Sequence, residues 1–374
     1  MNHLFFELIR VAIGTKKDLS RLPSEREWGE LYKMAAKQSL VGVCFAGLRR
    51  LGADADEGFA RFGISKMMYL NWMGQACLIQ LRNEKVNRQC VELQAKLAAD
   101  GMHSCILKGQ GVGLLYGEYL HNLRQSGDID IFVAGGMKRT YEYCEQKYGN
   151  FEWDYINAHI PVFEDTEVEL HWRVHSHPNL FKNKQLQEWL KEHELRALQG
   201  NEADLGCGTI TVPTTEFNTF FILLHCYHHM FESGLGLRQL MDYYFVLKEF
   251  QELSEVSKDS VCDLYKQFSM ERFASAVMWI MKYVFGMQDK YLLCKPNEKE
   301  GRFILNEVMQ NGNFGHHDER KHKIKNKIVA PFATRIQHNW HLATHYPSEF
   351  FWSPVWLMWH FVWKRTVSKR LRNN

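Results

Sequence analysis

Residues 128–133, Asp-Ile-Asp-Ile-Phe-Val, constrain this chain more than any other segment. Successive side chains of a strand point to opposite faces, so the segment predicts a strand with Ile129 and Ile131 in the core and with Asp128 and Asp130 on the other face. Two carboxylates on one strand edge repel unless a cation lies between them. Mg²⁺ is commonly held by one or two carboxylates plus substrate phosphates. The segment therefore predicts a divalent-metal site, with a solvated strand start as the alternative, since Asp-x-Asp is common.

The hydrophobic periodicity changes twice along the chain. The N-terminal part has helical spacing, with a helix start where Ser24 and Glu27 form a capping box and with a long helix that ends at Gly101. Short apolar strands then mix with helices, and helical spacing returns after Pro213. We therefore predict an α+β fold, a small mixed β-sheet core flanked by N-terminal and C-terminal helical regions. The predicted regions are residues 1–100, 101–213 and 214–374.

The middle region contains several short elements in succession. Strands are expected at residues 103–107, 128–133, 159–163 and 167–172, helices at 114–120 and 137–149, and turns at 108–113 and 164–166. Further along, the polar and basic residues 311–327 are expected to form an exposed loop.

Composition narrows the class of protein. A formal net charge of +3 gives no reason to expect nucleic acid as a partner. The 9 cysteines include no Cys-x-x-Cys pair, which argues against a zinc ribbon or a thioredoxin-type site and favours reduced thiols. The N-terminal apolar run lacks a basic n-region and a cleavage site, and no run reaches the roughly 18–20 apolar residues of a membrane span. We therefore expect a cytoplasmic protein without a transmembrane segment.

A glycine-rich turn, Lys108-Gly109-Gln110-Gly111-Val112-Gly113, precedes the acid pair. Glycines allow a backbone to approach a phosphate closely, and Lys108 adds a compact positive charge. Arg124 is able to reach a phosphate oxygen bidentately, or is a surface residue. The turn is neither a P-loop nor a dinucleotide fingerprint. It predicts a nucleotide-binding role for Lys108, Gly109, Gln110 and Arg124, although a plain tight turn has the same pattern.

A third carboxylate is expected from a neighbouring strand. Residues 166–172 alternate well, so Glu167, Glu169 and His171 share one face, while Val168 and Leu170 share the other. Glu169 is placed to complete the metal site and to accept the proton of an attacking hydroxyl. An outward-facing polar stripe on a half-exposed strand is the alternative.

Several of these residues together resemble a known family. They are Leu107-Lys108-Gly109, Leu115-Tyr116, Arg124, Gly127 through Val133, Glu169-Leu170-His171-Trp172 and the helical stretch 234–247. The pattern resembles the uncharacterised bacterial nucleotidyltransferase family, within the DNA polymerase β-like superfamily, over residues 25–330.

The resemblance implies a nucleotidyltransferase fold and metal-dependent transfer of a nucleoside monophosphate, with release of pyrophosphate. It implies metal-ligand and catalytic roles for Asp128, Asp130 and Glu169, and a phosphate role for the turn at Lys108 and Gly109. The superfamily's turn usually reads Gly-Gly or Gly-Ser. This chain has Gln110 at the second position, so we expect Gln110 or Lys108 to replace the serine as the phosphate contact.

Other patterns point less directly to chemistry. The histidines at 171, 175 and 177 and at 225, 228 and 229 lack the Glu or Cys partners of known zinc signatures, which favours structural histidines. Arg238 and Asp242 have the spacing of an intrahelical pair, although Arg238 is also able to face the triphosphate. The aromatic run 350–363 and the basic tail that follows it suit either a membrane surface or packing on the protein's own helices, and we favour the second.

Two functions remain open at this stage. The first is transfer of a nucleoside monophosphate from a nucleoside triphosphate to a hydroxyl of a small molecule or protein, with Mg²⁺ or Mn²⁺ as cofactor. The second is a catalytically degenerate nucleotide-binding or interaction module of a toxin–antitoxin or defence type. Retention of both aspartates and the glutamate favours the first.

Overall fold

The computed structural model describes residues 1–374 except 54–57, 199–200, 255, 316–339 and 373–374. The helices are α1 (Asn2–Ala12), α2 (Glu25–Lys37), α3 (Val41–Arg50), α4 (Gly58–Arg61), α5 (Lys66–Ala99), α6 (Gly109–Gly113), α7 (Gly136–Tyr148), α8 (Leu180–Leu198), α9 (Thr215–Glu232), α10 (Leu237–Leu253), α11 (Lys258–Gln267), α12 (Glu271–Phe285), α13 (Glu298–Asn311) and α15 (Pro347–Arg372). The strands are β1 (Ser104–Ile106), β2 (Ile129–Val133), β3 (Glu152–Trp153), β4 (Asn157–Ile160), β5 (Val168–His171), β6 (Asn201–Asp204) and β7 (Thr209–Val212). Short 3₁₀ helices cover Leu114–Tyr116, His121–Leu123, Asp289–Tyr291, Asn313–Gly315 and Trp340–Leu342.

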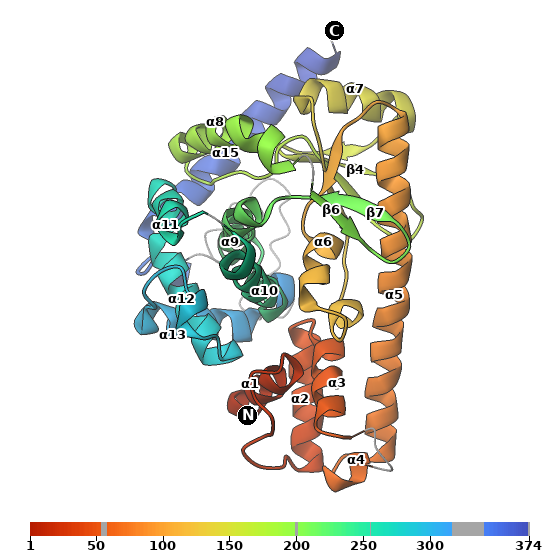
Figure 1. Ribbon diagram of the computed structural model, residues 1–374. Helices are drawn as coiled ribbons and strands as arrows, with labels where there is room; N and C mark the ends of the chain where they lie inside the picture. Colours follow the sequence, from red (N-terminus) through yellow and green to blue (C-terminus); the bar gives the residue numbers. More distant parts are fainter. Residues whose placement is uncertain (54–57, 199–200, 255, 316–339, 373–374) are drawn as a thin grey trace, which may run out of the picture.

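Helices surround a small sheet, as Figure 1 shows. Helix α5 runs along one side of the molecule, from the N-terminal helices α1–α4 at one end to the sheet at the other. Helices α9 and α10 lie beside α6, and α11, α12 and α13 form a further layer outside them. The arrangement confirms the predicted α+β fold with a small mixed sheet flanked by helices; the three-region division stays a prediction.

The main sheet has five strands in the order β1-β2-β5-β4-β3. Strands β2 and β5 are parallel, whereas the other neighbours are antiparallel, so the sheet is mixed. The register between β2 and β5 pairs Asp130 with Glu169 and Ile131 with Leu170. Because residues paired side by side in neighbouring strands point to the same face, Asp130 and Glu169 project from one face of the sheet.

The opposite face of the sheet carries the apolar core of this end of the molecule. Ile129, Ile131 and Leu170 are buried there against Val86 and Cys90 of α5. Burial of this face fixes the pairing register, because a slip of one residue would turn Asp130 into the core. Burial of the apolar residues on one face of the sheet therefore determines that the acidic residues lie on the other face.

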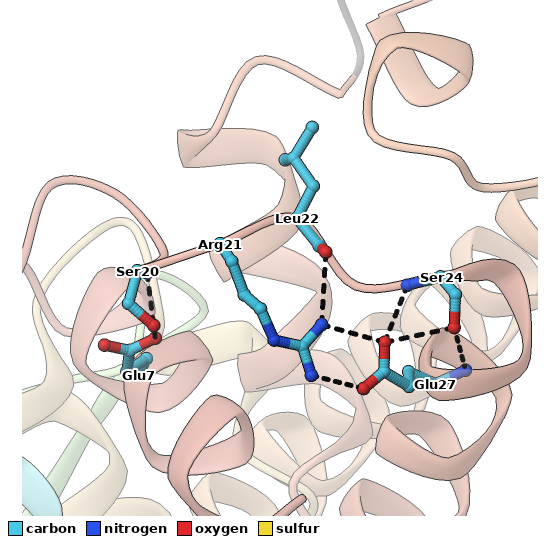
Figure 2. A network of polar contacts seen from close by, with 6 residues as sticks. All are labelled: Glu7, Ser20, Arg21, Leu22, Ser24 and Glu27. Atoms are coloured by element: carbon cyan, nitrogen blue, oxygen red, sulfur yellow. Dashed lines mark hydrogen bonds and ion pairs between the residues drawn. The ribbon is translucent and has the colours of Figure 1, made fainter.

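The capping box predicted at the start of α2 is present (Figure 2). The backbone N–H of Ser24 donates to Glu27 Oε2 at 2.9 Å, and Arg21 Nη1 donates to the same oxygen at 2.9 Å. These contacts satisfy N–H groups that have no intrahelical partner and bring a cation to Glu27. They hold the pKa of the Glu27 carboxyl at about 2.

The prediction for residues 108–120 was wrong in detail. The expected glycine turn is itself the short helix α6, and the expected helix at 114–120 is only the 3₁₀ turn Leu114–Tyr116. Gly117 ends that turn with a φ of +72°, in the left-handed region where glycine is favoured. Gly109, with a φ of +47°, provides the sharp change of direction between β1 and α6. The sequence also did not predict α8, the strand β3 or the β6–β7 hairpin.

The C-terminal helix α15 packs by one face and exposes the other. Trp356, Trp359 and Trp363 each meet the ring of Tyr155, with ring centroids 5.0–5.4 Å apart. The predicted packing on the protein's own helices is present, since Trp352 meets Phe181 of α8 and Tyr227 of α9 donates to Glu349, and the segment between β3 and β4 is a further partner. Among the described residues, no helix has the length and apolar character needed to cross a membrane. Most of the loop expected at 311–327 lies outside the described residues, and its first residue ends α13.

Candidate active site

A cavity of about 330 Å³ lies over the acidic face of the sheet. Strands β2, β4 and β5 and helices α9 and α10 all contribute to its walls. Five carboxylates line it among the described residues, namely Asp128, Asp130, Asp154, Glu169 and Asp242, against the lysine and arginine side chains of Lys108, Arg124 and Arg238. The excess of carboxylates makes the cavity suited to a cation.

Asp130, Glu169 and His171 form the group in the described chain whose ligand atoms lie within 4.8 Å of one another. His171 Nε2 lies 3.0 Å from Asp130 Oδ1 and 3.2 Å from Glu169 Oε2. Burial opposes a charge on His171, but its bonds to the two carboxylates outweigh burial and raise its pKa to about 9. The proton on this imidazole therefore lies between the same two carboxylates that a metal would bridge.

Lys108 and Asp128 complete this side of the cavity. Lys108 Nζ lies 2.7 Å from Asp130 Oδ1; Asp130 is buried, and the Lys108 side chain is 15% exposed. Burial acts against the Asp130 charge, yet Lys108 and His171 together lower the pKa of its carboxyl. The neighbouring Asp130 charge, aided by burial, raises the pKa of Asp128 to about 6. Asp130 is thus strongly favoured as an anion, whereas its negative charge disfavours ionisation of Asp128.

Gln110 is turned away from the cavity. Its side-chain amide donates to Asn83 Oδ1 at 3.4 Å and to Asn87 Oδ1, both on α5. The side chain is buried between α6 and α5 and its amide hydrogens have acceptors there, which disfavours the expected phosphate contact; a nucleotide-binding role for Gln110 stays a prediction. Gly109, by contrast, lines the cavity beside Lys108.

Arg124 lines the cavity and is held by a partner that the sequence did not indicate. Its Nε and Nη2 donate to the two carboxylate oxygens of Asp242, each at 2.7 Å. Tyr116 also donates to Asp242, at 2.7 Å. Arg238 Nη1 donates to the backbone oxygen of Gln125 at 2.8 Å. Asp242 thus binds bidentately a residue far from it in the sequence, and the expected intrahelical pair with Arg238 stays a prediction.

Histidines form another wall of the cavity. His225, His228 and His229 project from α9 at helical spacing, and His175 follows β5. The rings of His175 and His228 are 4.6 Å apart. Burial lowers the pKa of His175, His225 and His229 well below the usual value, so these rings are neutral at pH 7. His228 Nε2 lies 2.9 Å from Glu232 Oε2, one turn further along α9.

Sequence reasoning gave no functional role to these histidines. The signal for His171 was available, because strand alternation already placed it on the face of Glu169. The contribution of His175 and of α9 was not available, because no local pattern shows that α9 covers the sheet at this point.

Comparison with known proteins agrees with this geometry. Residues 24–286 match a family described as uncharacterised nucleotidyltransferase. The chain belongs to this family. The match to the uncharacterised nucleotidyltransferase family includes β1 to β5 as well as α9 and α10, so it covers every wall of the cavity.

Searches of characterised and solved proteins add little detail. No curated protein matches the chain. A solved structure, an antigenic nucleotidyltransferase-like protein from Paracoccidioides brasiliensis, matches with 13% identity and a TM-score of 0.33, over 49% of this chain and 88% of the other. A similarity at this level carries no argument about the site.

Proposed function

We propose that the chain transfers a nucleoside monophosphate from a nucleoside triphosphate to a hydroxyl of a small molecule or protein, with Mg²⁺ or Mn²⁺ as cofactor. The observation that carries the proposal is the meeting of Asp128, Asp130, Glu169 and His171 in one cavity that Lys108 also lines. Membership of the nucleotidyltransferase family supports it, because a nucleoside triphosphate is the substrate that the family description implies.

The donor set fits a divalent cation. Asp130 and Glu169 offer oxygen ligands, and His171 Nε2 would offer a nitrogen after losing its proton, all within 4.8 Å of one another. Carboxylates suit both Mg²⁺ and Mn²⁺, and Asp128 adds a further carboxylate next to Asp130. A bound divalent cation supplies neutralisation of the triphosphate and lowers the pKa of the acceptor hydroxyl.

The chain's own residues then have distinct tasks. Glu169 takes the proton of the acceptor hydroxyl as the new oxygen–phosphorus bond forms and the bond to pyrophosphate breaks. Asn157 Nδ2 donates to Glu169 Oε2 at 2.5 Å, which orients this carboxylate. Lys108 lines the same cavity beside Asp130, where its ammonium would contact the leaving phosphates.

A catalytically degenerate nucleotide-binding or interaction module is the second candidate. It is favoured by one observation, which is that Gln110 stands at the superfamily's serine position and is bound to α5. In that case the nucleotide would stabilise the fold without being consumed.

One experiment separates the two candidates. The protein is incubated with each labelled nucleoside triphosphate and Mg²⁺ or Mn²⁺, alone and with cell lysate, and label is sought on protein and on small molecules. Metal-dependent labelling supports the transferase. A nucleotide-dependent rise in melting temperature without any labelling supports the degenerate module. If none of the four nucleotides causes labelling or raises the melting temperature, a nucleotide site is rejected.

A further inference from the structure

The position of Gln110 leaves a question about phosphate recognition. Its side chain is bound to α5, so the polyphosphate needs hydrogen-bond donors from elsewhere. Buried donors that face the cavity and lack an acceptor identify where such a ligand would bind, because burying an unpaired donor costs free energy that a ligand recovers.

Several buried nitrogens of the cavity wall meet this description, and Gln239 Nε2 is one of them besides the two considered next. Arg124 Nη1 and His175 Nε2 have no hydrogen-bond partner within the part of the chain that the structure describes. Both residues line the cavity, with 5% and 3% of their surface exposed, respectively.

The hydrogen bonds of His175 decide which nitrogen carries the proton. The backbone N–H of Ser176 donates to His175 Nδ1 at 2.8 Å, so Nδ1 is an acceptor. A neutral imidazole with an accepting Nδ1 has its proton on Nε2. Nε2 is therefore a buried donor in the cavity wall.

Arg124 is fixed in a similar way. Asp242 binds Nε and Nη2 at 2.7 Å each, which locks the plane of the guanidinium. Nη1 is left with its hydrogens unused. A guanidinium held in this way loses little further conformational freedom when it binds a phosphate oxygen.

We propose that Arg124 and His175 form the subsite for the polyphosphate tail of the nucleotide, in place of the side chain at position 110. This inference rests on the proposed function, since it identifies how the same cavity holds its substrate. Lys108, Arg124 and His175 line the same cavity as the carboxylates, so the subsite shares that cavity with the candidate metal site.

The competing explanation is that His175 only packs. Its ring meets His228 at 4.6 Å and an interplanar angle of 61°, and Phe221 at 6.2 Å, contacts that any flat side chain could make. A test must therefore separate the shape of the ring from its Nε2 hydrogen.

The test measures binding rather than turnover. Magnesium tripolyphosphate is titrated calorimetrically into the full chain and into His175→Phe and His175→Gln. The phenyl ring keeps the packing and removes the donor, whereas the glutamine amide places an N–H donor near the position of Nε2. We expect about tenfold weaker binding by His175→Phe and affinity within about threefold of the original chain for His175→Gln.

His177→Gln serves as the matched control. His177 is buried nearby but lies outside the cavity lining, and its Nε2 contacts the backbone oxygen of Phe268 at 3.1 Å. This variant is expected to bind tripolyphosphate with unchanged affinity. It reports any loss of binding that comes merely from a weakened fold.

Titration of a nucleotide into the same variants distinguishes a subsite for the nucleotide's polyphosphate from a subsite for free pyrophosphate. A non-hydrolysable triphosphate nucleotide should lose affinity by the same factor in His175→Phe, whereas a subsite for free pyrophosphate alone would leave nucleotide binding unchanged. The inference is overturned if the original chain does not bind tripolyphosphate, or if His175→Phe binds both ligands as tightly as the original chain. Labelling by nucleoside triphosphates is scored separately, so His175-dependent binding without labelling would retain the subsite and reject the transferase.

Discussion

At the scale of single residues, the cationic side chains around Asp130 determine what else its carboxylate is able to bind. The carboxylate has Lys108 at 2.7 Å and His171 at 3.0 Å, so two cationic groups occupy the space beside it in this structure. A metal ion that binds here has to replace at least one of these interactions.

Asp130→Asn should lower nucleotidyl transfer by at least ~100-fold, in line with the loss of roughly 3 kcal/mol of electrostatic stabilisation. The variant should also be less stable by about 3 kcal/mol, because Lys108 remains buried without its partner. Turnover is measured from labelled product at a temperature well below the melting midpoint.

Asp165→Asn is the control for this change. Asp165 is an aspartate with a 46% exposed side chain that pairs with Lys85, away from the cavity lining. Its replacement should alter neither turnover nor stability appreciably. Full turnover by Asp130→Asn would reject the catalytic assignment.

The buried histidines predict how stability depends on pH. Burial holds the pKa of His175, His225 and His229 well below the usual value and lowers that of His177 to about 4. Because the folded-state pKa lies below the unfolded value of 6.5, the unfolded chain binds more protons as the pH falls below about 6.5. The contribution of these four histidines should therefore be complete above that pH and should decrease steadily toward pH 4. His171, whose pKa is raised to about 9, acts in the opposite direction, and its contribution is lost as the pH rises from about 6.5 to 9.

Calorimetric melting between pH 8 and pH 4.5 at constant ionic strength checks this dependence. His177→Gln removes one of the titrating groups, so its melting temperature should fall less steeply with acidification. A melting temperature that does not change between pH 7.5 and pH 5 would contradict the assignment of neutral buried histidines.

At the scale of elements, side-chain hydrogen bonds between α5 and α6 hold α6 in place beside the cavity. Gln110 of α6 binds Asn83 and Asn87, while Asn83 also donates to the backbone oxygens of Asn122 and Arg124. This network joins α5 to the turn on one side and to the loop that carries Arg124 on the other. The side chain of Gln110, which was expected to contact a ligand, is thus part of the hydrogen-bond network that joins α6 to α5.

Gln110→Ala should destabilise the fold by about 1–3 kcal/mol, because it leaves buried amide groups without partners. The rise in melting temperature caused by a nucleoside triphosphate should nevertheless be the same as in the original chain. Thermal unfolding with and without nucleotide measures both effects.

Asn87→Ala provides the comparison, since it breaks the same network from α5. The two variants should lose similar stability and retain similar nucleotide-dependent shifts. A Gln110→Ala variant that keeps its stability but loses the nucleotide shift would show that this side chain contacts the nucleotide after all.

At the scale of the whole molecule, the two ends of the chain are tied to the catalytic core by different helices. Helix α5 links the N-terminal helices to the sheet, and α15 extends across to the segment between β3 and β4 (Figure 1). Trp356 is 7% exposed, whereas Phe351 on the other side of α15 is 61% exposed. The packed face of α15 reaches Asp154, a cavity residue, through His360 at 2.5 Å.

Trp356→Ala should lower the free energy of unfolding by about 3 kcal/mol, because the indole is buried against Tyr155. Phe351→Ala should change it by no more than about 0.5 kcal/mol, because most of that ring is in solvent. Denaturant unfolding of both variants compares the two faces of α15. Equal effects would contradict packing of this helix on the core.

The sequence alone determined the class of fold and the acidic face of the sheet. The period of two along residues 128–133 and 166–172 fixes which side chains share a face, since alternation is a property of the strand itself. It therefore put Asp128 with Asp130, and Glu169 with His171, without knowledge of the fold. The helices before and after the sheet could be predicted for the same reason, because helical periodicity is also a property of the element itself.

Tertiary structure alone decided which partners these side chains meet. Arg124 binds Asp242, which lies 118 positions away, and Gln110 binds Asn87, which lies 23 positions away. Local periodicity gives the direction of a side chain but not the element that packs over it. The histidines of α9 and His175 face the same cavity because burial of the apolar face of the sheet and of α9 brings them there, and that packing is a property of the whole chain.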